Sequence, residues 1–216
     1  RFPEKHHGRS LTQFRAHYHD DKISKWDIFH YVYALLHHPA YRTKFADNLK
    51  RELPRIPFAP SLSVKPGRKY GKVPSAIADG FWAFAGAGKK LADLHLNYEE
   101  APEFPLIEKV TIGLPRSPRV ETKMKLTKDK SALIVNDSLT LGGIPPETFH
   151  YKLGNRSALE WIIDQYQVYT DPRTQITSDP NAWGEEHNNP EYIVQLVGRI
   201  ITVSLETQKI VEALPA

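Results

Sequence analysis

Polar positions dominate the start of the chain, and an apolar helical pattern follows them. Residues 1–22 are polar and rich in histidine without a clear period, so we expect an arm or a linker from an upstream domain. From residue 26 to residue 37 nearly every position is apolar, which predicts a buried helix. Ser24 and Asp27 have the spacing of a capping box, so this helix should begin beside them.

Prolines and glycines divide the next part of the chain. Pro39 breaks the first helix and starts a second one, predicted over residues 40–53, which Pro54 ends. Apolar positions return with helical spacing over residues 75–97, although glycines weaken the pattern in the middle turns. The chain up to residue 97 is therefore predicted to be mainly helical.

The period then changes from helical to alternating. Residues 120–127 alternate between apolar and polar, which indicates a half-buried strand. A turn and the apolar run 132–135 follow, so residues 120–136 should form an antiparallel hairpin. Shorter strands are expected near residues 139–141 and 149–153. The side chains predicted to point inward from the first strand are Val120, Thr122, Met124 and Leu126.

Helical patterns return near the end of the chain. Ser157 and Glu160 form a second capping box, which predicts a helix through about Gln167. The polar stretch 170–189 is longer than most loops of compact domains, and such loops are usually functional or disordered. A last helix is predicted over residues 190–214.

These elements predict an α+β fold. Its N-terminal part is helical, a small and mostly antiparallel sheet lies in the middle, and its C-terminal part is helical. We expect residues 23–216 to form one domain.

Composition narrows the possible chemistry. The 216 residues include no cysteine, which excludes a disulfide scaffold, a thiolate zinc site and a cysteine nucleophile. The lack of cysteine also fits a cytoplasmic protein, which is the location that we expect. No apolar run approaches the ~20 residues that span a bilayer, so we expect no membrane partner. The chain begins at Arg1, which suggests a piece of a longer polypeptide. The net charge of +4 permits binding to a polyanion without requiring it.

The run Phe84-Ala85-Gly86-Ala87-Gly88 matches the F-x-G-x-G core by which amino-methyltransferases hold S-adenosylmethionine. In that motif the glycines form a tight turn after a strand. No strand pattern precedes residue 84, and no Asn-Pro-Pro-Tyr or Asp-Pro-Pro-Tyr tetrapeptide occurs in the chain. Close packing of a helix through small residues is the preferred interpretation. Cofactor binding by a divergent methyltransferase stays open as an alternative.

The ten histidines raise the question of a metal site. Two of them, at positions 17 and 19, cluster with Asp20 and Asp21, and adjacent pairs occur at 6–7 and 37–38, but no His-Glu-x-x-His or other ligand spacing is present. We therefore expect no metal site and no catalytic residues in this chain.

Basic residues gather in two segments. Residues 61–75 carry four positive charges and no acid, and residues 116–130 carry six against two acids. Such side chains neutralise phosphates or contact guanine edges, although a solvated face has the same pattern. The candidate DNA contacts in these segments are Lys65, Arg68, Lys69, Lys72, Arg116, Arg119, Lys123 and Lys125, and Arg68, Arg116 and Arg119 are the favoured base readers.

Four strings resemble a known family. In chain order they are WDIFHYVYALLH with PAYR (residues 26–42), LKRELPRIPF (49–58), GKKLADLHLNYE (88–99) and YKLGNRSALEW (151–161). They resemble the C-terminal specificity domain of type ISP restriction-modification enzymes and related helicase–methylase proteins. The tail VSLET (203–207) is similar to the closing helix of that family, so the resemblance covers nearly the whole chain.

The resemblance implies a target recognition domain that is not itself an enzyme. It implies a parent chain with a nuclease, a helicase-like ATPase and an N6-adenine methyltransferase, to which this domain would present the target adenine. S-adenosylmethionine, ATP and Mg²⁺ are expected in the parent and not in this part. The implied partners are double-stranded DNA and the methyltransferase domain of the same chain.

Three polar residues of the matching strings are further DNA-contact candidates: Arg55, Asn155 and Arg156. Each could equally cap or bridge buried backbone. A structural coupling domain between the methyltransferase and the motor remains a further alternative.

Overall fold

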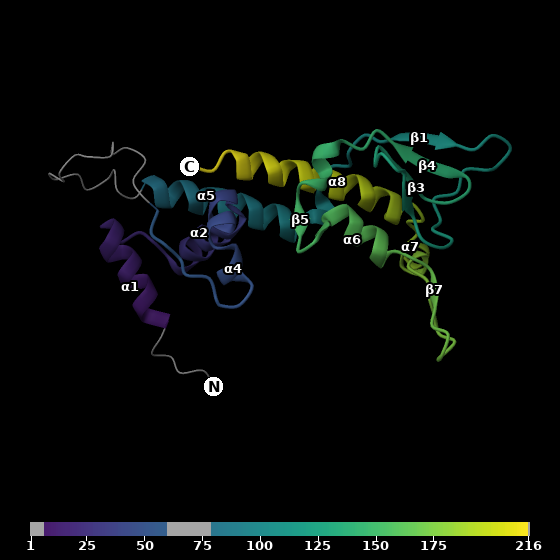
Figure 1. Cartoon of the computed structure of the whole chain (residues 1–216). Helices are drawn as coiled ribbons and strands as arrows, with labels where there is room; N and C mark the ends of the chain where they lie inside the picture. Colours follow the sequence, from purple (N-terminus) through teal and green to yellow (C-terminus); the bar gives the residue numbers. More distant parts are fainter. Residues whose placement is uncertain (1–6, 60–78, 216) are drawn as a thin grey trace. The chain divides into compact units, whose positions relative to one another are not determined.

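Two groups of elements, each with its own hydrophobic core, make up the chain in a computed structural model that describes residues 7–59 and 79–215 (Figure 1). The first unit comprises the described residues up to Leu96 together with residues 209–215. The second unit is Asn97–Gln208. The predicted α+β fold is confirmed.

The first unit is helical. Its helices are α1 (His7–Tyr18), α2 (Lys25–His37), α3 (Pro39–Lys44), α4 (Ala46–Leu49) and α5 (Asp79–Leu96), and the end of α8 (Tyr192–Glu212) also belongs to it. Helix α1 lies within the segment for which the sequence suggested an arm or linker, and its Phe14 and Tyr18 are buried in the core. Aromatic rings dominate that core, since Tyr18, Tyr31 and Phe81 are fully buried.

The predicted capping box starts α2. The Ser24 N–H donates to the Asp27 carboxylate at 2.8 Å, and the Asp27 N–H donates to Ser24 Oγ at 3.2 Å. The prediction that this helix is buried all round is wrong, because Trp26 is 71% exposed and Phe29 is 49% exposed. Helix α5 covers the side of α2 that carries Tyr31 and Ala34, while the opposite side stays open.

The second predicted helix is broken into two short ones. Phe45 adopts φ −111° and ψ 20°, which interrupts the helix between α3 and α4. The helical pattern ends at Leu49 rather than at residue 53, and Leu53 is 90% exposed. An apolar side chain without a core to face does not extend a helix, because most helical stability comes from packing.

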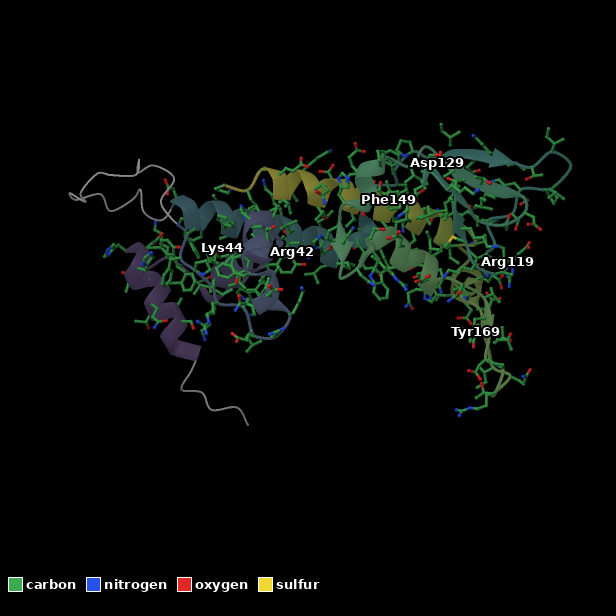
Figure 2. All side chains as sticks on the ribbon, viewed as in Figure 1. Arg42, Lys44, Arg119, Asp129, Phe149 and Tyr169 are labelled. Carbon is green, nitrogen blue, oxygen red and sulfur yellow. The ribbon has the colours of Figure 1, made fainter. Side chains whose placement is uncertain are left out.

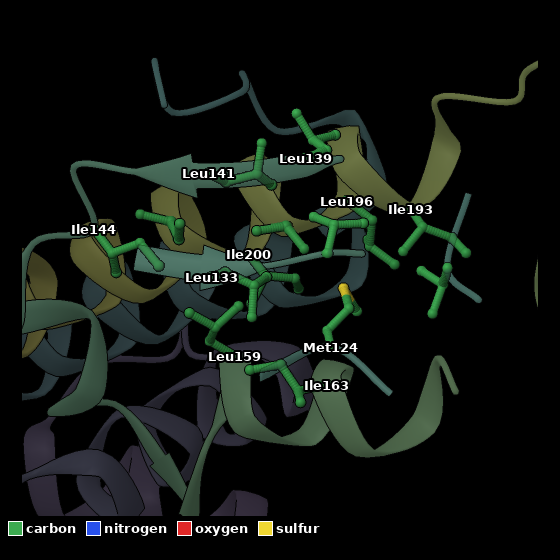
Figure 3. Packing of buried hydrophobic residues seen from close by; sticks show 14 of the residues in the cluster. Met124, Leu133, Leu139, Leu141, Ile144, Leu159, Ile163, Ile193, Leu196 and Ile200 are labelled. Carbon is green, nitrogen blue, oxygen red and sulfur yellow. The ribbon is translucent and has the colours of Figure 1, made fainter. Parts of the chain in front are cut away.

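The second unit is built on a four-stranded antiparallel sheet. Its strand order is β1 (Ile107–Val110), β4 (Leu139–Gly142), β3 (Ala132–Ile134) and β2 (Lys125–Leu126). Leu133, Leu139 and Leu141 extend from the sheet toward Leu196 and Ile200 of α8 (Figure 3). Helix α6 (Ala158–Gln165) adds Leu159 and Ile163 to the same core (Figure 3).

The predicted hairpin over residues 120–136 is confirmed but is shorter than expected. Strands β2 and β3 pair with Lys125 opposite Ile134, and Val120 and Met124 are buried as predicted. Thr122 is exposed, so its predicted inward position is wrong. The chain before β2 leaves the hairpin, because Lys123 forms a bridge with Gln167 instead.

Short elements complete the second unit. The 3-10 helices are η2 (Tyr98–Glu100) and η3 (Pro146–Phe149), and two small hairpins are formed by β5 (Lys152–Leu153) with β6 (Arg156–Ser157) and by β7 (Tyr169–Thr170) with β8 (Thr177–Ser178). Helix α7 (Asn181–Glu186) follows the second hairpin. The long polar stretch 170–189 is therefore ordered into a hairpin and a helix.

The second capping box is also confirmed. The Ser157 N–H donates to Glu160 Oε2 at 2.8 Å, and the Glu160 N–H donates to Ser157 Oγ at 3.2 Å.

In the described ranges 7–59 and 79–215, no helix combines the length and apolar character that crossing a membrane requires.

Candidate nucleic-acid interface

Two adjoining cavities of the second unit gather positively charged side chains. Their volumes are about 710 Å³ and about 570 Å³, and both are lined by Asn155 and Glu160. The β2–β3 hairpin, η3, the β5–β6 hairpin and α6 supply their walls. We call the two cavities together the basic cleft. Its cations are Lys123, Lys125, Lys130, Lys152 and Arg156, and its acids are Asp129, Glu160 and Asp164.

Lys130 and Glu160 form the centre of the first cavity. Lys130 Nζ lies 2.9 Å from Glu160 Oε1 and 4.9 Å from the centre of the Phe149 ring. Burial opposes ionisation of Glu160, but hydrogen bonds from Lys130 and from the N–H and hydroxyl of Ser157 outweigh it and lower the pKa of Glu160 to about 2. Glu160 is therefore an anion at neutral pH, and it holds the Lys130 ammonium in place.

Asp129, which is labelled in Figure 2, organises the turn that carries Lys130 through its hydrogen bonds. It accepts hydrogen bonds from the Thr127 hydroxyl at 2.6 Å and from the Ser131 hydroxyl at 2.8 Å. The Thr127 hydroxyl first, and then Ser131, lower the pKa of Asp129 to about 2. This carboxylate is directed at its own turn, and Lys130 adopts the left-handed conformation with φ +58°.

In the second cavity, one carboxylate serves two cations. Lys123 and Arg156 both form ion pairs with Asp164, and the Arg156 guanidinium also lies 5.5 Å from the centre of the Trp161 ring. Lys125 and Lys152 are exposed, and no ion pair holds either of them within the described residues. The cleft thus keeps an excess of positive charge that faces solvent.

The structure brings four of the predicted DNA contacts together. Lys123, Lys125, Asn155 and Arg156 line the second cavity, although they lie up to 33 positions apart in the chain (156 minus 123). Asn155 follows Gly154, whose φ of +72° turns the chain between β5 and β6. Their role as DNA contacts stays a prediction, but their common location is a structural finding.

Arg116 and Arg119 lie outside the cleft and are held by carboxylates. Arg116 contacts both oxygens of Glu108, at 2.6 and 2.7 Å, and both oxygens of Glu191, at 2.6 and 2.9 Å. The hydrogen bonds that Arg116 donates to Glu108, followed by those that it donates to Glu191, raise the pKa of Arg116. Arg119 is paired with Asp179 and Glu185. Their proposed reading of bases stays a prediction.

The remaining sequence candidates lie elsewhere. Arg55 belongs to the first unit, where its side chain is 91% exposed and 3.9 Å from Glu52. Its backbone carbonyl accepts a hydrogen bond from the Tyr41 hydroxyl at 2.8 Å. The other four candidates lie outside the described residues: Lys65, Arg68, Lys69 and Lys72.

Sequence reasoning missed two cations of the cleft. Lys130 is the last residue of the basic segment 116–130, so the sequence shows its charge. Because Lys130 lies in a turn, the alternation of a strand does not predict which way its side chain points. Lys152 stands in the family-like string 151–161, where the polar residues chosen were Asn155 and Arg156. A prediction of the β5–β6 hairpin would have placed Lys152 near them, because Lys152 pairs with Ser157.

The run Phe84–Gly88 does not have the geometry of a cofactor loop. It lies within the continuous helix α5, and the described residues directly before it, 79–83, are helical as well. The preferred interpretation, close packing of a helix, is confirmed at Gly88, which lies against the backbone of His30. Across the described residues, no three histidine or carboxylate side chains gather closely enough to hold a metal ion.

A family model described as the type ISP C-terminal specificity domain matches residues 7–196. A nuclease-deletion mutant of the type ISP restriction-modification enzyme LlaGI, in complex with a DNA substrate mimic, is 38% identical, with a TM-score of 0.71 over 91% of this chain and 17% of that chain. The ATP-dependent type ISP enzyme LlaBIII bound to DNA is 33% identical, with a TM-score of 0.74 over 90% of this chain and 12% of that one.

A DrdV–DNA complex is also similar, at 34% identity and a TM-score of 0.74 over 97% of this chain and 20% of that chain. No curated protein matches at a significant level. The chain spans at most a fifth of the length of each of these three solved proteins.

Proposed function

Because this chain belongs to the type ISP C-terminal specificity domain family, we propose that it is the target recognition domain of a restriction-modification enzyme and holds double-stranded DNA at the basic cleft of its second unit. The observation that carries the proposal is the convergence of Lys123, Lys125, Asn155 and Arg156 on one cavity. The similar proteins LlaGI, LlaBIII and DrdV are described with DNA or a DNA mimic, which supports the same partner here.

The cleft suits a phosphate backbone. Lysine ammonium groups neutralise phosphates, while side-chain amides such as Asn155 donate hydrogen bonds to phosphate and sugar oxygens. Lys125 and Lys152 are the strongest candidates, because neither is engaged by a carboxylate within the described residues. Lys123 and Arg156 would exchange part of their bonding to Asp164 for phosphate, which makes Asp164 the residue that orients them before DNA arrives.

We further propose that this domain presents the target adenine to an N6-adenine methyltransferase elsewhere in the parent chain. S-adenosylmethionine, ATP and Mg²⁺ would be bound by those other parts. The similar enzyme LlaBIII is ATP-dependent, and the LlaGI protein is a mutant from which a nuclease was deleted. This chain corresponds to only 17% of the LlaGI chain and 12% of the LlaBIII chain, which leaves room for such activities in the rest of a parent chain. A cytoplasmic location, where such enzymes meet DNA, belongs to the same proposal.

A coupling domain that touches DNA only incidentally is the competing function, since it would have the same fold. Selection of bound duplexes from a pool with a randomised central segment distinguishes the two. A specificity domain should enrich a defined sequence, and its affinity should fall steeply with salt because bound phosphates release counterions. If the chain binds DNA but enriches no sequence, the result supports the coupling role and contradicts target recognition by this chain.

A further inference from the structure

The hairpin formed by β7 and β8 has no face that packs on a core. It extends from the rest of the second unit (Figure 1), with Tyr169 at its start (Figure 2). Tyr169 is 53% exposed and Ile176 is 69% exposed, and the turn residues 172–175 are exposed as well. An isolated two-stranded hairpin is marginally stable in water, so such a hairpin keeps one shape only when other interactions hold it.

Hydrogen bonds inside the hairpin supply that support. The Thr170 and Thr177 hydroxyls lie 2.8 Å apart across the strands, and the Asp171 N–H donates to the Ile176 carbonyl at 3.0 Å. The Asp171 carboxylate accepts from the N–H groups of Arg173 at 2.9 Å and Thr174 at 2.7 Å. The bonds from Thr174, and then the one from Arg173, lower the pKa of Asp171, so the turn is organised at neutral pH.

The base of the hairpin is fixed to the core of the second unit. The Asn181 side chain, which is 8% exposed, accepts from the Val120 N–H at 2.9 Å and donates to the Val120 carbonyl at 2.8 Å. Arg119 adds its ion pair with Asp179, directly after β8. The hairpin is therefore a preformed projection on a rigid base, and not a loop that needs ordering.

Its dimensions match the major groove of B-DNA. Three extended residues from Tyr169 to the turn span about 10 Å at ~3.3 Å per residue, which exceeds the groove depth of about 8.5 Å. Two paired strands lie about 4.8 Å apart, and a two-stranded ribbon fits a groove about 12 Å wide.

The turn carries an arginine whose charge is available. The second unit contains five arginines, and four of them are held by carboxylates: Arg116, Arg119, Arg156 and Arg199. Among these described residues Arg173 is the exception. Among the described residues no ion pair joins its guanidinium to the nearby Asp171, whose carboxylate accepts from the backbone N–H groups of the turn.

Gln175 stands beside Arg173 at the tip. Its φ of +57° is a conformation that side-chain-bearing residues rarely adopt, so the backbone there is set by the turn. One amide hydrogen donates to the Pro172 carbonyl at 2.8 Å, and Gln175 as a whole is exposed. Arginine pairs bidentately with guanine, and glutamine pairs bidentately with adenine through its amide oxygen and an amide hydrogen.

We propose that the β7–β8 hairpin enters the major groove of the target duplex and that Arg173 and Gln175 are specificity-determining residues that contact base edges. This inference rests on the proposed function, since it requires that the domain bind DNA. It gives the two parts of the second unit different tasks: the basic cleft holds phosphates, and the hairpin tip discriminates sequence.

The test first selects the preferred duplex of the whole chain from a randomised pool, and then compares four variants on that duplex and on a scrambled one. Arg173→Ala should weaken binding to the selected duplex by about 5- to 150-fold and leave the scrambled duplex nearly unchanged. Arg173→Lys keeps the charge but loses the bidentate fork, so it should show most of the same loss. Gln175→Gly keeps the left-handed backbone while removing the amide, and it should relax the preference at one base pair.

Lys109→Ala is the matched control, because Lys109 is an exposed cation on β1, away from the hairpin. It should leave the selected sequence and its affinity unchanged. Equal losses on both duplexes for Arg173→Ala would show a phosphate contact and overturn base reading. Unchanged binding by all hairpin variants would show that the hairpin contacts something other than DNA. Failure of the unaltered chain to enrich any sequence would instead remove the proposed function itself.

Discussion

Gly88 of α5 lies directly against the backbone carbonyl of His30 in α2. A Cβ added at Gly88 would lie 1.8 Å from the His30 oxygen and 3.2 Å from the Ala34 nitrogen. These contacts are with backbone atoms, which do not move aside as a flexible side chain does. The two helices can approach this closely only because residue 88 has no side chain.

Gly88→Ala should therefore destabilise the first unit by about 1–3 kcal/mol, since overpacking forces the two helices apart. Gly86→Ala is the matched control, because nothing lies within 4 Å of its added Cβ. It should stabilise the protein by about 0.5–1 kcal/mol through helix propensity. Urea unfolding curves measure both changes, and equal effects of the two substitutions would contradict close packing at Gly88.

Asn181→Ala should destabilise the second unit. Asn181 satisfies both the N–H and the carbonyl of Val120, which is fully buried, and removal of the amide leaves these groups without partners. Loss of partners for a buried backbone group costs about 1–3 kcal/mol. The measurement is the midpoint of thermal or urea unfolding. Asn155→Ala, at an exposed position in the cleft, is the comparison and should change stability little.

Glu160→Gln should reduce the loss of stability in acid. The pKa of Glu160 is lowered to about 2 from an ordinary value of 4.5, so its contribution is complete above about pH 4.5 and disappears as the pH falls toward 2. Urea midpoints between pH 5 and pH 2 should therefore fall less steeply in the variant. Glu121→Gln, at an exposed carboxylate, serves as control, and parallel curves for all three proteins would contradict the prediction.

His95 should make the first unit sensitive to mild acid. Burial first, and then the neighbouring His37, lower the pKa of His95 to about 4, and Tyr33 Oη lies 2.7 Å from its Nδ1. The unfolded chain then binds more protons between about pH 6.5 and pH 4, so stability falls as the pH drops through that window. His95→Gln, which does not titrate, should flatten the curve of unfolding midpoint against pH in that range.

Lys125→Ala and Lys152→Ala should weaken binding to selected and scrambled duplexes alike. Each phosphate contact that is lost should lower the slope of log affinity against log salt by roughly 0.9. Fluorescence anisotropy over a salt series measures this slope, and Lys109→Ala on β1 provides the charge-matched control. If both cleft variants have the same slope of log affinity against log salt as the unaltered chain, the phosphate contacts lie elsewhere.

The sequence by itself determined the elements whose signals are local. Ser24 with Asp27, and Ser157 with Glu160, define helix starts because both partners of each capping box lie within one turn. The alternation around Met124 and the following turn predicted the β2–β3 hairpin for the same reason. The small residues of α5 indicated close packing before the partner helix was known.

Only the tertiary structure decided which distant segments meet. Thr122 follows the alternating pattern but is exposed, because the adjacent Lys123 pairs with Gln167, 44 positions later (167 minus 123). Arg116 and Arg119 have the same charge as Arg173, yet carboxylates from remote parts of the chain hold them, while no ion pair within the described part of the chain holds Arg173.

The difference has a physical cause. A helix cap, or the alternation of a strand, depends on residues that are close together in the sequence, so it can be read from the sequence directly. The availability of a charge depends on which side chains the fold brings within a few ångströms, and a hydrogen bond or ion pair forms only at that distance.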